Sequence, residues 1–107
     1  MTFVRSSRDI IIQTPNLAAA RAFYEGVLGF AVVMDEPNMI GLETGSVRLF
    51  VEQREAHPAT LDFLTDDFEG LKARLQAAGC QIDDDDPSLP RCYFVDPFGL
   101  HFNIGRA

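Results

Sequence analysis

Apolar positions in the first half of the chain follow two periods in turn. The run 9–14 (DIIIQT) is rich in β-branched residues and predicts a strand. The next apolar residues are spaced three and four apart and predict a helix that Asn16 caps and Gly29 ends. Further strands are expected at 31–34, 39–43 and 47–52. The apolar stripe expected on the helix consists of Leu17, Ala20, Phe23, Tyr24, Val27 and Leu28.

The second half repeats this order after a polar, proline-ended stretch at 53–58 that is predicted to be a linker. A strand at 60–65 leads to a helix that Asp66 or Asp67 caps and Gly79 ends. The acidic run at 83–86 is expected to be a solvated loop. The helix stripe is expected to be Phe68, Leu71, Leu75 and Ala78, and the remaining strands are expected at 81–82, 92–95 and 100–104.

The two halves superpose at an offset of 51 residues, and each is predicted as strand, helix and three strands. Such a half has its helix on one face of a small sheet and cannot bury both faces alone. The sequence therefore predicts an α+β fold, a single domain at 1–107, with one βαβββ module at about 3–54 and another at about 58–107. The two sheets are expected to form a cupped, incomplete barrel.

Composition and charge narrow the possible partners. The chain has 107 residues, 47% of them hydrophobic, and a formal net charge of −7, which disfavours a nucleic-acid partner and favours a cationic ligand. No apolar run is long enough to cross a membrane, and the N-terminus lacks the apolar stretch of a secretory signal. Cys80 and Cys92 have no metal-binding spacing and are expected to be reduced. We therefore expect a cytoplasmic protein.

Three segments resemble the vicinal-oxygen-chelate superfamily, which includes glyoxalase I, bleomycin-resistance proteins and extradiol dioxygenases. PNLAAARAFYEGVLGF at 15–30 resembles the first-module helix of this superfamily, and FLTDDFEGLKARLQAAG at 63–79 resembles the second-module helix. YFVDPFGLHFNI at 93–104 resembles the final hairpin. The resemblance implies paired βαβββ modules, a homodimer and a cleft for a small molecule.

The resemblance also implies where a metal would be held in metal-dependent members. The corresponding positions are Asp9, Glu52, Thr60 and Asn103. The superfamily's usual donors are histidine and glutamate, whereas threonine is a poor ligand and asparagine offers only a neutral carbonyl. No metal or other cofactor is therefore expected. If a metal is bound, the candidate ligands are Asp9, Glu52 and His101, whereas His57 is expected at the surface.

Side-chain alternation assigns a set of residues to the faces that would line the cup. Phe50 and Tyr93 could stack on a planar ligand, the carboxylates could pair with a cation, and Arg48 or Arg91 could pair with an anion. Alternatively, Arg48 and Arg91 neutralise Glu52 and Asp62 across the sheet. The candidate ligand-binding residues are Gln13, Arg48, Phe50, Glu52, Asp62, Arg91, Tyr93, His101 and Asn103.

The resemblance and these residues favour a metal-free protein that binds or sequesters an aromatic, cationic small molecule such as an antibiotic. The alternative is a metal-dependent lyase, isomerase or dioxygenase with an unusual ligand set around Glu52 and His101. A third alternative is a module whose main role is protein association. No nucleophile–base pair is visible in the sequence, and the candidates for a lone general base are His101 and a buried Glu52.

Overall fold

The computed structural model describes residues 3–89 and 91–107, and the chain forms two compact units. The N-terminal unit is Arg8–Ala59. The C-terminal unit combines Thr60–Ala107 with the start of the chain up to Ser7. Strand β1 (Val4–Thr14) therefore contributes its first residues to the C-terminal unit and the rest to the N-terminal unit.

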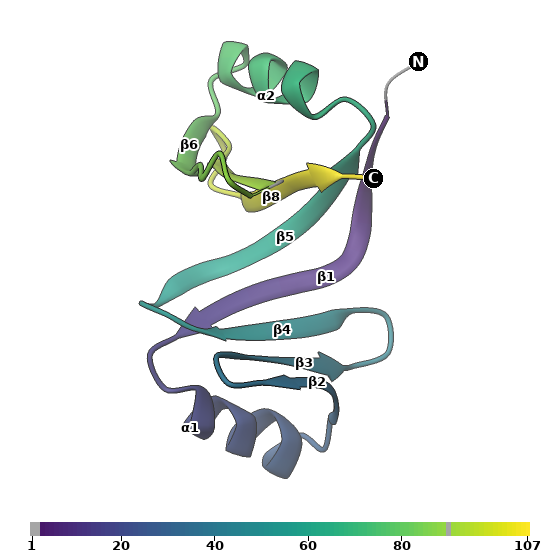
Figure 1. The fold of residues 1–107 in the computed structure, drawn as a ribbon, viewed down its shortest axis with the longest axis vertical. Helices are drawn as coiled ribbons and strands as arrows, with labels where there is room; N and C mark the ends of the chain where they lie inside the picture. Colours follow the sequence, from purple (N-terminus) through teal and green to yellow (C-terminus); the bar gives the residue numbers. More distant parts are fainter. Residues whose placement is uncertain (1–2, 90) are drawn as a thin grey trace. The chain divides into compact units, whose positions relative to one another are not determined.

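The N-terminal unit places one helix on one face of a small sheet (Figure 1). The sheet order is β2-β3-β4-β1, in which β1 and β4 are parallel and the other pairs are antiparallel. The parallel register pairs Asp9 with Arg48 and Gln13 with Glu52. The remaining elements are α1 (Leu17–Arg21), a π-helical segment η1 (Ala22–Val27), β2 (Ala31–Glu36), β3 (Met39–Glu43) and β4 (Arg48–Gln53).

The C-terminal unit has the same connectivity, which confirms the repeat and the α+β class. Its sheet order is β5-β8-β7-β6, and again the first and last strands of the module are parallel. The register places Asp62 beside Asn103 and Asn103 beside Tyr93. The elements are β5 (His57–Thr65), α2 (Phe68–Ala77), β6 (Gln81–Asp84), β7 (Arg91–Val95) and β8 (His101–Arg106).

The predicted helix ends are confirmed. The side-chain oxygen of Asn16 accepts a hydrogen bond from the backbone N–H of Ala19 at 3.0 Å. Asp67, and not Asp66, caps α2 by accepting from the backbone N–H of Gly70 at 3.0 Å. Both stop glycines have a positive φ, 77° at Gly29 and 95° at Gly79, which a side chain would disfavour.

Removing the cap of α2 should weaken the C-terminal unit. We expect Asp67→Ala to lower the free energy of unfolding by about 1 kcal/mol, because the N–H of Gly70 loses its acceptor. Urea unfolding followed by circular dichroism measures the change.

The same cap determines what an alanine at Gly70 would do. Inside a helix, replacing glycine with alanine normally raises the free energy of unfolding by about 1 kcal/mol.

A Cβ at Gly70 would overlap the carboxylate of Asp67 and push it out of its capping position. We therefore expect Gly70→Ala to leave the free energy of unfolding nearly unchanged, because the gain in helix propensity is offset by the lost cap. A clear stabilisation of Gly70→Ala would contradict this account of the cap.

The core of the N-terminal unit corrects part of the predicted helix stripe. Ile40, Leu42 and Val51 are buried, and Leu17, Ala20 and Tyr24 from the helix pack on them as expected. The rest of the stripe is exposed, because η1 has π-helical winding, with the N–H of Leu28 bonded to the C=O of Phe23 at 3.0 Å. This wider turn rotates the later residues out of the 3.6-residue period. The exposed fractions are 49% for Phe23, 72% for Val27 and 49% for Leu28.

The core of the C-terminal unit follows the predicted stripe more closely. Phe68 and Leu71 of α2 are buried against the sheet, while Leu75 is partly buried and Ala78 is exposed. On the sheet, the rings of Phe94 and Phe102 stack with centroids 5.9 Å apart. The buried members of this cluster are Phe68, Leu71, Cys92, Phe94, Phe102 and Ile104.

Both cysteines are free, and they differ in depth. Cys92 is fully buried, and its burial raises the pKa of its thiol to about 11. Cys80 is half-buried, and burial together with the charge of Asp96 raises the pKa of its thiol as well. Both thiols should therefore be poor nucleophiles at neutral pH.

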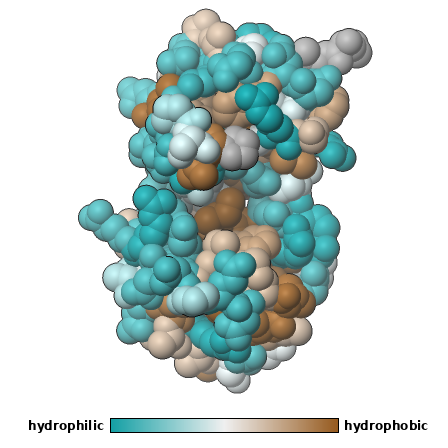
Figure 2. Space-filling model, viewed as in Figure 1, coloured by the Kyte–Doolittle hydropathy of each residue, from teal (hydrophilic) through white to brown (hydrophobic). Residues whose placement is uncertain are grey.

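Apolar residues also reach the surface, and Figure 2 shows brown patches between hydrophilic side chains on the face it presents.

Several predicted boundaries are wrong. The expected linker 53–58 overlaps the end of β4 and the start of β5, and His57 is half-buried in β5. The acidic run is not a free loop, because its first two residues belong to β6. Nζ of Lys72 lies 2.5 Å from Oδ2 of Asp85, and this contact raises the pKa of Lys72. Asp86 accepts from the backbone N–H of Ser88 at 3.0 Å, so the run is held by specific partners.

Candidate functional site

The sheet of the C-terminal unit has one face that carries no helix. Phe63, Phe102 and their apolar neighbours point toward α2. Because successive side chains in a strand alternate, Asp62, Tyr93 and Asn103 point to the opposite face. This helix-free face gathers the predicted site residues of the unit: Asp62, Arg91, Tyr93, His101 and Asn103.

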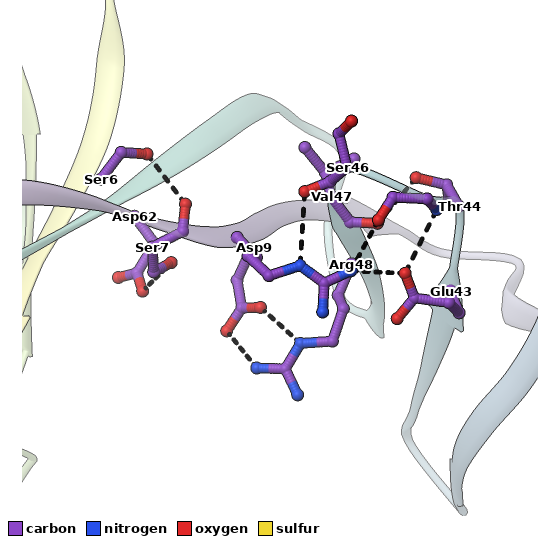
Figure 3. A network of polar contacts seen from close by, with 11 residues as sticks. Ser6, Ser7, Asp9, Glu43, Thr44, Ser46, Val47, Arg48 and Asp62 are labelled. Atoms are coloured by element: carbon purple, nitrogen blue, oxygen red, sulfur yellow. Dashed lines mark hydrogen bonds and ion pairs between the residues drawn. The ribbon is translucent and has the colours of Figure 1, made fainter.

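Asp62 is the centre of a short hydrogen-bonded row. Its Oδ2 accepts from the hydroxyl of Ser7 at 2.7 Å, as Figure 3 shows, and its Oδ1 accepts from Nδ2 of Asn103 at 2.8 Å. Ser7 belongs to β1, whereas Asp62 and Asn103 are paired in the register of β5 and β8. Both carboxylate oxygens are thus oriented by donors from neighbouring strands, which fixes the carboxylate in the face.

Asn103 carries an unused acceptor. Its side chain is 7% exposed, and its Oδ1 accepts no hydrogen bond from the residues that the structure describes. The amide orientation follows from its partner, since an ionised Asp62 can only accept and so must face Nδ2. A buried acceptor without a donor costs about 1–3 kcal/mol. The position therefore suits a ligand that brings an N–H or O–H donor.

Tyr93 and Arg91 form one side of the same face. Tyr93 is 7% exposed, and the guanidinium carbon of Arg91 lies 4.5 Å from the centre of its ring. Arg91 also donates from Nη1 to Oδ2 of Asp84 at 3.2 Å. The expected neutralisation of Asp62 by Arg91 is therefore wrong, because Arg91 pairs with Asp84, and the charge of Asp62 is met by neutral donors instead.

His101 lies two residues before Asn103 on β8 and shares its face. Its Nδ1 is 4.0 Å from Oδ2 of Asp83 in β6. Thr60, one of the positions implied by the resemblance, is 2% exposed. A histidine close to a carboxylate can act as a general base, and Asp83 is one such carboxylate beside His101.

The helix-free face of the N-terminal sheet holds the other predicted residues, and they bind one another. Asp9 accepts a bidentate pair from Arg48, with Nε at 2.9 Å and Nη2 at 3.2 Å (Figure 3). Gln13 donates to Glu52 at 2.9 Å. The guanidinium of Arg48 lies 5.4 Å from the centre of the Phe50 ring. The expected pairing of Arg48 with Glu52 is therefore wrong, because the parallel register sets Arg48 opposite Asp9.

These contacts bear on the metal positions that the resemblance implies. Asp9 is opposite Arg48, and Glu52 is four residues further along β4, which is about 13 Å at about 3.3 Å per residue. Both oxygens of Asp9 are held by Arg48, and Oε1 of Glu52 accepts from Gln13. In the C-terminal unit the implied metal positions are Thr60 and Asn103, which offer only a hydroxyl and a neutral amide. This donor set does not fit a transition-metal ion of the superfamily's usual kind.

Two residues of these faces were missed by the sequence-based reasoning. Ser7 was missed because the first strand was expected to begin at Asp9, although Ser7 is two residues earlier and therefore on the same face. Asp84 was missed because it was assigned to a solvated loop. The run from Arg5 to Asp9 is polar throughout, so no alternation signalled the longer strand.

Comparison with known proteins agrees with this geometry. A family model described as a glyoxalase-like domain matches residues 9–105. No curated protein matches the chain significantly. A glyoxalase/bleomycin resistance protein/dioxygenase superfamily member from Vibrio splendidus 12B01 is similar over 100% of both chains, with 17% identity and a TM-score of 0.64.

Two larger proteins are also similar in structure. The Mn(II)-bound glyoxalase from Novosphingobium aromaticivorans has 20% identity and a TM-score of 0.66, over 99% of this chain and 40% of that one. A variant of homoprotocatechuate 2,3-dioxygenase from B. fuscum has 22% identity and a TM-score of 0.62, over 96% of this chain and 32% of that one. The chain thus spans less than half of these two proteins, and at such identities the likeness concerns the fold. Among the described residues, no helix is long and apolar enough to cross a membrane.

Proposed function

Because the chain belongs to the family of glyoxalase-like domains, we propose that it binds a small aromatic cation on the helix-free face of its C-terminal unit. The cation lies between the carboxylate of Asp62 and the amide oxygen of Asn103. The protein holds or sequesters this molecule without the help of a metal ion. An antibiotic of this chemistry is one candidate ligand.

One observation carries the proposal: the buried Oδ1 of Asn103 accepts no hydrogen bond from the described residues and lies beside a fixed carboxylate. A neutral acceptor next to a negative charge is matched by a group with several N–H donors and a positive charge, such as an ammonium, amidinium or guanidinium. An anion would face an acceptor and a carboxylate there. We therefore expect the positively charged end of the ligand, which carries the N–H donors, to lie against Asp62 and Asn103.

The surrounding residues support the rest of the ligand's description. The C-terminal unit carries nine acidic and five basic side chains, so its field attracts cations and repels anions. Tyr93 offers an aromatic ring beside Asn103 in the register, although Arg91 lies over one side of that ring. A planar group would extend the stack of guanidinium and ring.

A matched pair of planar probes tests the charge preference. Proflavine, a tricyclic cation, is expected to bind saturably and raise the Tm, and acridine-9-carboxylate, an anion with the same ring system, is expected to bind at least tenfold more weakly. Isothermal titration calorimetry measures both, and the proflavine affinity should fall as salt is raised. Equal affinity for the two probes, or no binding of proflavine, would contradict the proposal.

Metal analysis tests the second half of the proposal. Protein purified without chelator and without a histidine tag is expected to carry well under one equivalent of Fe, Ni, Zn or Mn per chain. The reason is that the implied ligand positions are occupied by an ion pair, a threonine and an amide. One tightly bound equivalent per chain, retained through dialysis, would favour the metal-dependent enzyme instead.

A further inference from the structure

The C-terminal unit contains a second concave feature, on the opposite face of its sheet from Asp62 and Asn103. It is a cavity of about 460 Å³ between α2 and the sheet. Leu71, Leu75 and Ala78 line it from the helix side, and Phe63, Phe102 and Ile104 line it from the strands. We infer that this cavity is a binding site for an uncharged apolar molecule of two or three rings.

The size of the cavity points to a ligand. The cavity is open to solvent, since its lining residue Phe98 is 94% exposed, and its volume of about 460 Å³ is in the range of small-molecule sites. An apolar cavity of about 150 Å³ accommodates benzene, and small-molecule sites range from about 300 to 1,000 Å³. The helix and sheet are also incompletely closed, since Phe63 and Leu75 pack on the core yet stay only partly buried. A molecule of two or three rings would fill the space between them.

The lining decides the chemistry of the occupant. Apart from Asp96 the lining side chains are apolar or sulfur-containing. Oδ1 of Asp96 already accepts from the backbone N–H groups of Phe98 and Leu100, at 2.8 and 2.9 Å, and so organises the turn at the rim. A polar ligand would lose its hydration without replacement, and an anion would also meet the negative field of this unit. An uncharged apolar ligand pays neither cost.

The rim of the cavity is apolar as well. Phe98 lines it while remaining 94% exposed, and Val4 and Leu100 line it at 50% and 38% exposure. These side chains would bury further surface against a ligand seated in the mouth. The half-buried thiol of Cys80 also lines the cavity and so reports on its occupancy.

Two fluorescent probes with one ring skeleton test the site. N-phenyl-1-naphthylamine is uncharged, and 8-anilino-1-naphthalenesulfonate adds a single negative charge. The uncharged probe is expected to bind saturably at one per chain, with the anionic probe at least tenfold weaker. No saturable binding, or equal binding of both probes, would overturn the inference. Binding at one per two chains, with a doubling of mass in sedimentation, would show that a second copy covers the cavity instead.

Adjacent alanines at the C-terminal end of α2, its last residue Ala77 and its C-cap Ala78, provide a matched pair of variants. Ala78→Trp places an indole in the cavity and should weaken the uncharged probe at least tenfold, whereas Ala77→Trp, just outside the lining, should change its affinity less than twofold. Asp62→Asn should leave this probe unaffected, which separates failure of this site from failure of the cation site. Similar effects of the two tryptophan variants would contradict the assignment.

Alkylation of the native protein tests the site without any substitution. Trypsin cleavage after Arg74 and Arg91 places Cys80 and Cys92 on different peptides, so mass spectrometry follows each thiol. Because both pKa values are raised, N-ethylmaleimide should react slowly near pH 7 and faster as the pH rises, at Cys80 first. Saturating N-phenyl-1-naphthylamine should slow the reaction of Cys80 at least fivefold. An unchanged rate at Cys80 would place the probe elsewhere and overturn the inference.

Discussion

Replacing Phe94 with alanine is expected to lower the free energy of unfolding of the C-terminal unit by about 3–5 kcal/mol. Phe94 is fully buried, stacks on Phe102 and lies in β7. Truncation removes a large apolar area from the core and leaves a cavity that β7 and β8 cannot close without losing their register. Since small domains have total stabilities of about 5–15 kcal/mol, the loss should be severe.

Phe98 supplies the matched control. It is the same residue type four positions later, but it is 94% exposed, so Phe98→Ala should change the free energy of unfolding by less than about 0.5 kcal/mol. In a Tyr24→Phe background Tyr93 is the single tyrosine, so urea unfolding followed by tyrosine fluorescence reports on the C-terminal unit. Comparable losses for both variants, or no loss for Phe94→Ala in this signal, would contradict the assignment of Phe94 to this core.

The parts of the fold that sequence predicted well are those set by local chemistry. Asn16 and Asp67 cap helices because a short side chain can reach an early backbone N–H, and Gly29 and Gly79 end them because they tolerate a positive φ. These requirements act over three or four residues and are visible in the chain itself. Because the second half of the chain repeats the pattern of the first, the repeat then predicted the same order of strands and helix in both units.

The parts that sequence could not predict depend on choices with small energetic differences. The π-helical winding of η1 moves Phe23, Val27 and Leu28 to the surface, and nothing in their apolar pattern distinguishes it from an ordinary helix turn. The early start of β1 at Val4 was missed for a related reason, since its first residues are polar and exposed. Propensity gave no support there, and pairing with neighbouring strands decided the structure.

The geometry of the candidate site, too, could be predicted from the sequence only in part. Alternation placed Asp62, Tyr93 and Asn103 on one face correctly, because the period of a strand is fixed. It could not say which charges would meet, since that depends on register and on the reach of long side chains. Arg48 and Arg91 therefore pair with Asp9 and Asp84 rather than with the acids first expected. Asp62 is left with two neutral donors, which is the basis of the proposed cation site.

Replacing Asp62 with asparagine is expected to weaken proflavine binding about 10- to 100-fold. The carboxylate contributes a charge-assisted hydrogen bond, worth about 1.5–3 kcal/mol. The substitution also removes the free acceptor of Asn103, which is the other half of the proposed site. A new amide N–H at position 62 can donate to Oδ1 of Asn103 once the Asn103 amide turns over, and the free acceptor is then satisfied within the protein. Calorimetric titration of the variant measures the loss.

Glu69→Gln is the matched control for charge. It removes the same unit of negative charge from a side chain that is 75% exposed on α2, which packs on the other face of the sheet. We expect its proflavine affinity to change less than twofold at physiological salt, because an exposed charge at that distance is screened. Circular dichroism should show that both variants keep the native fold. If Asp62→Asn retained full affinity, or if Glu69→Gln lost as much, the cation would be held by the general field of the acidic surface and not by the Asp62–Asn103 pair.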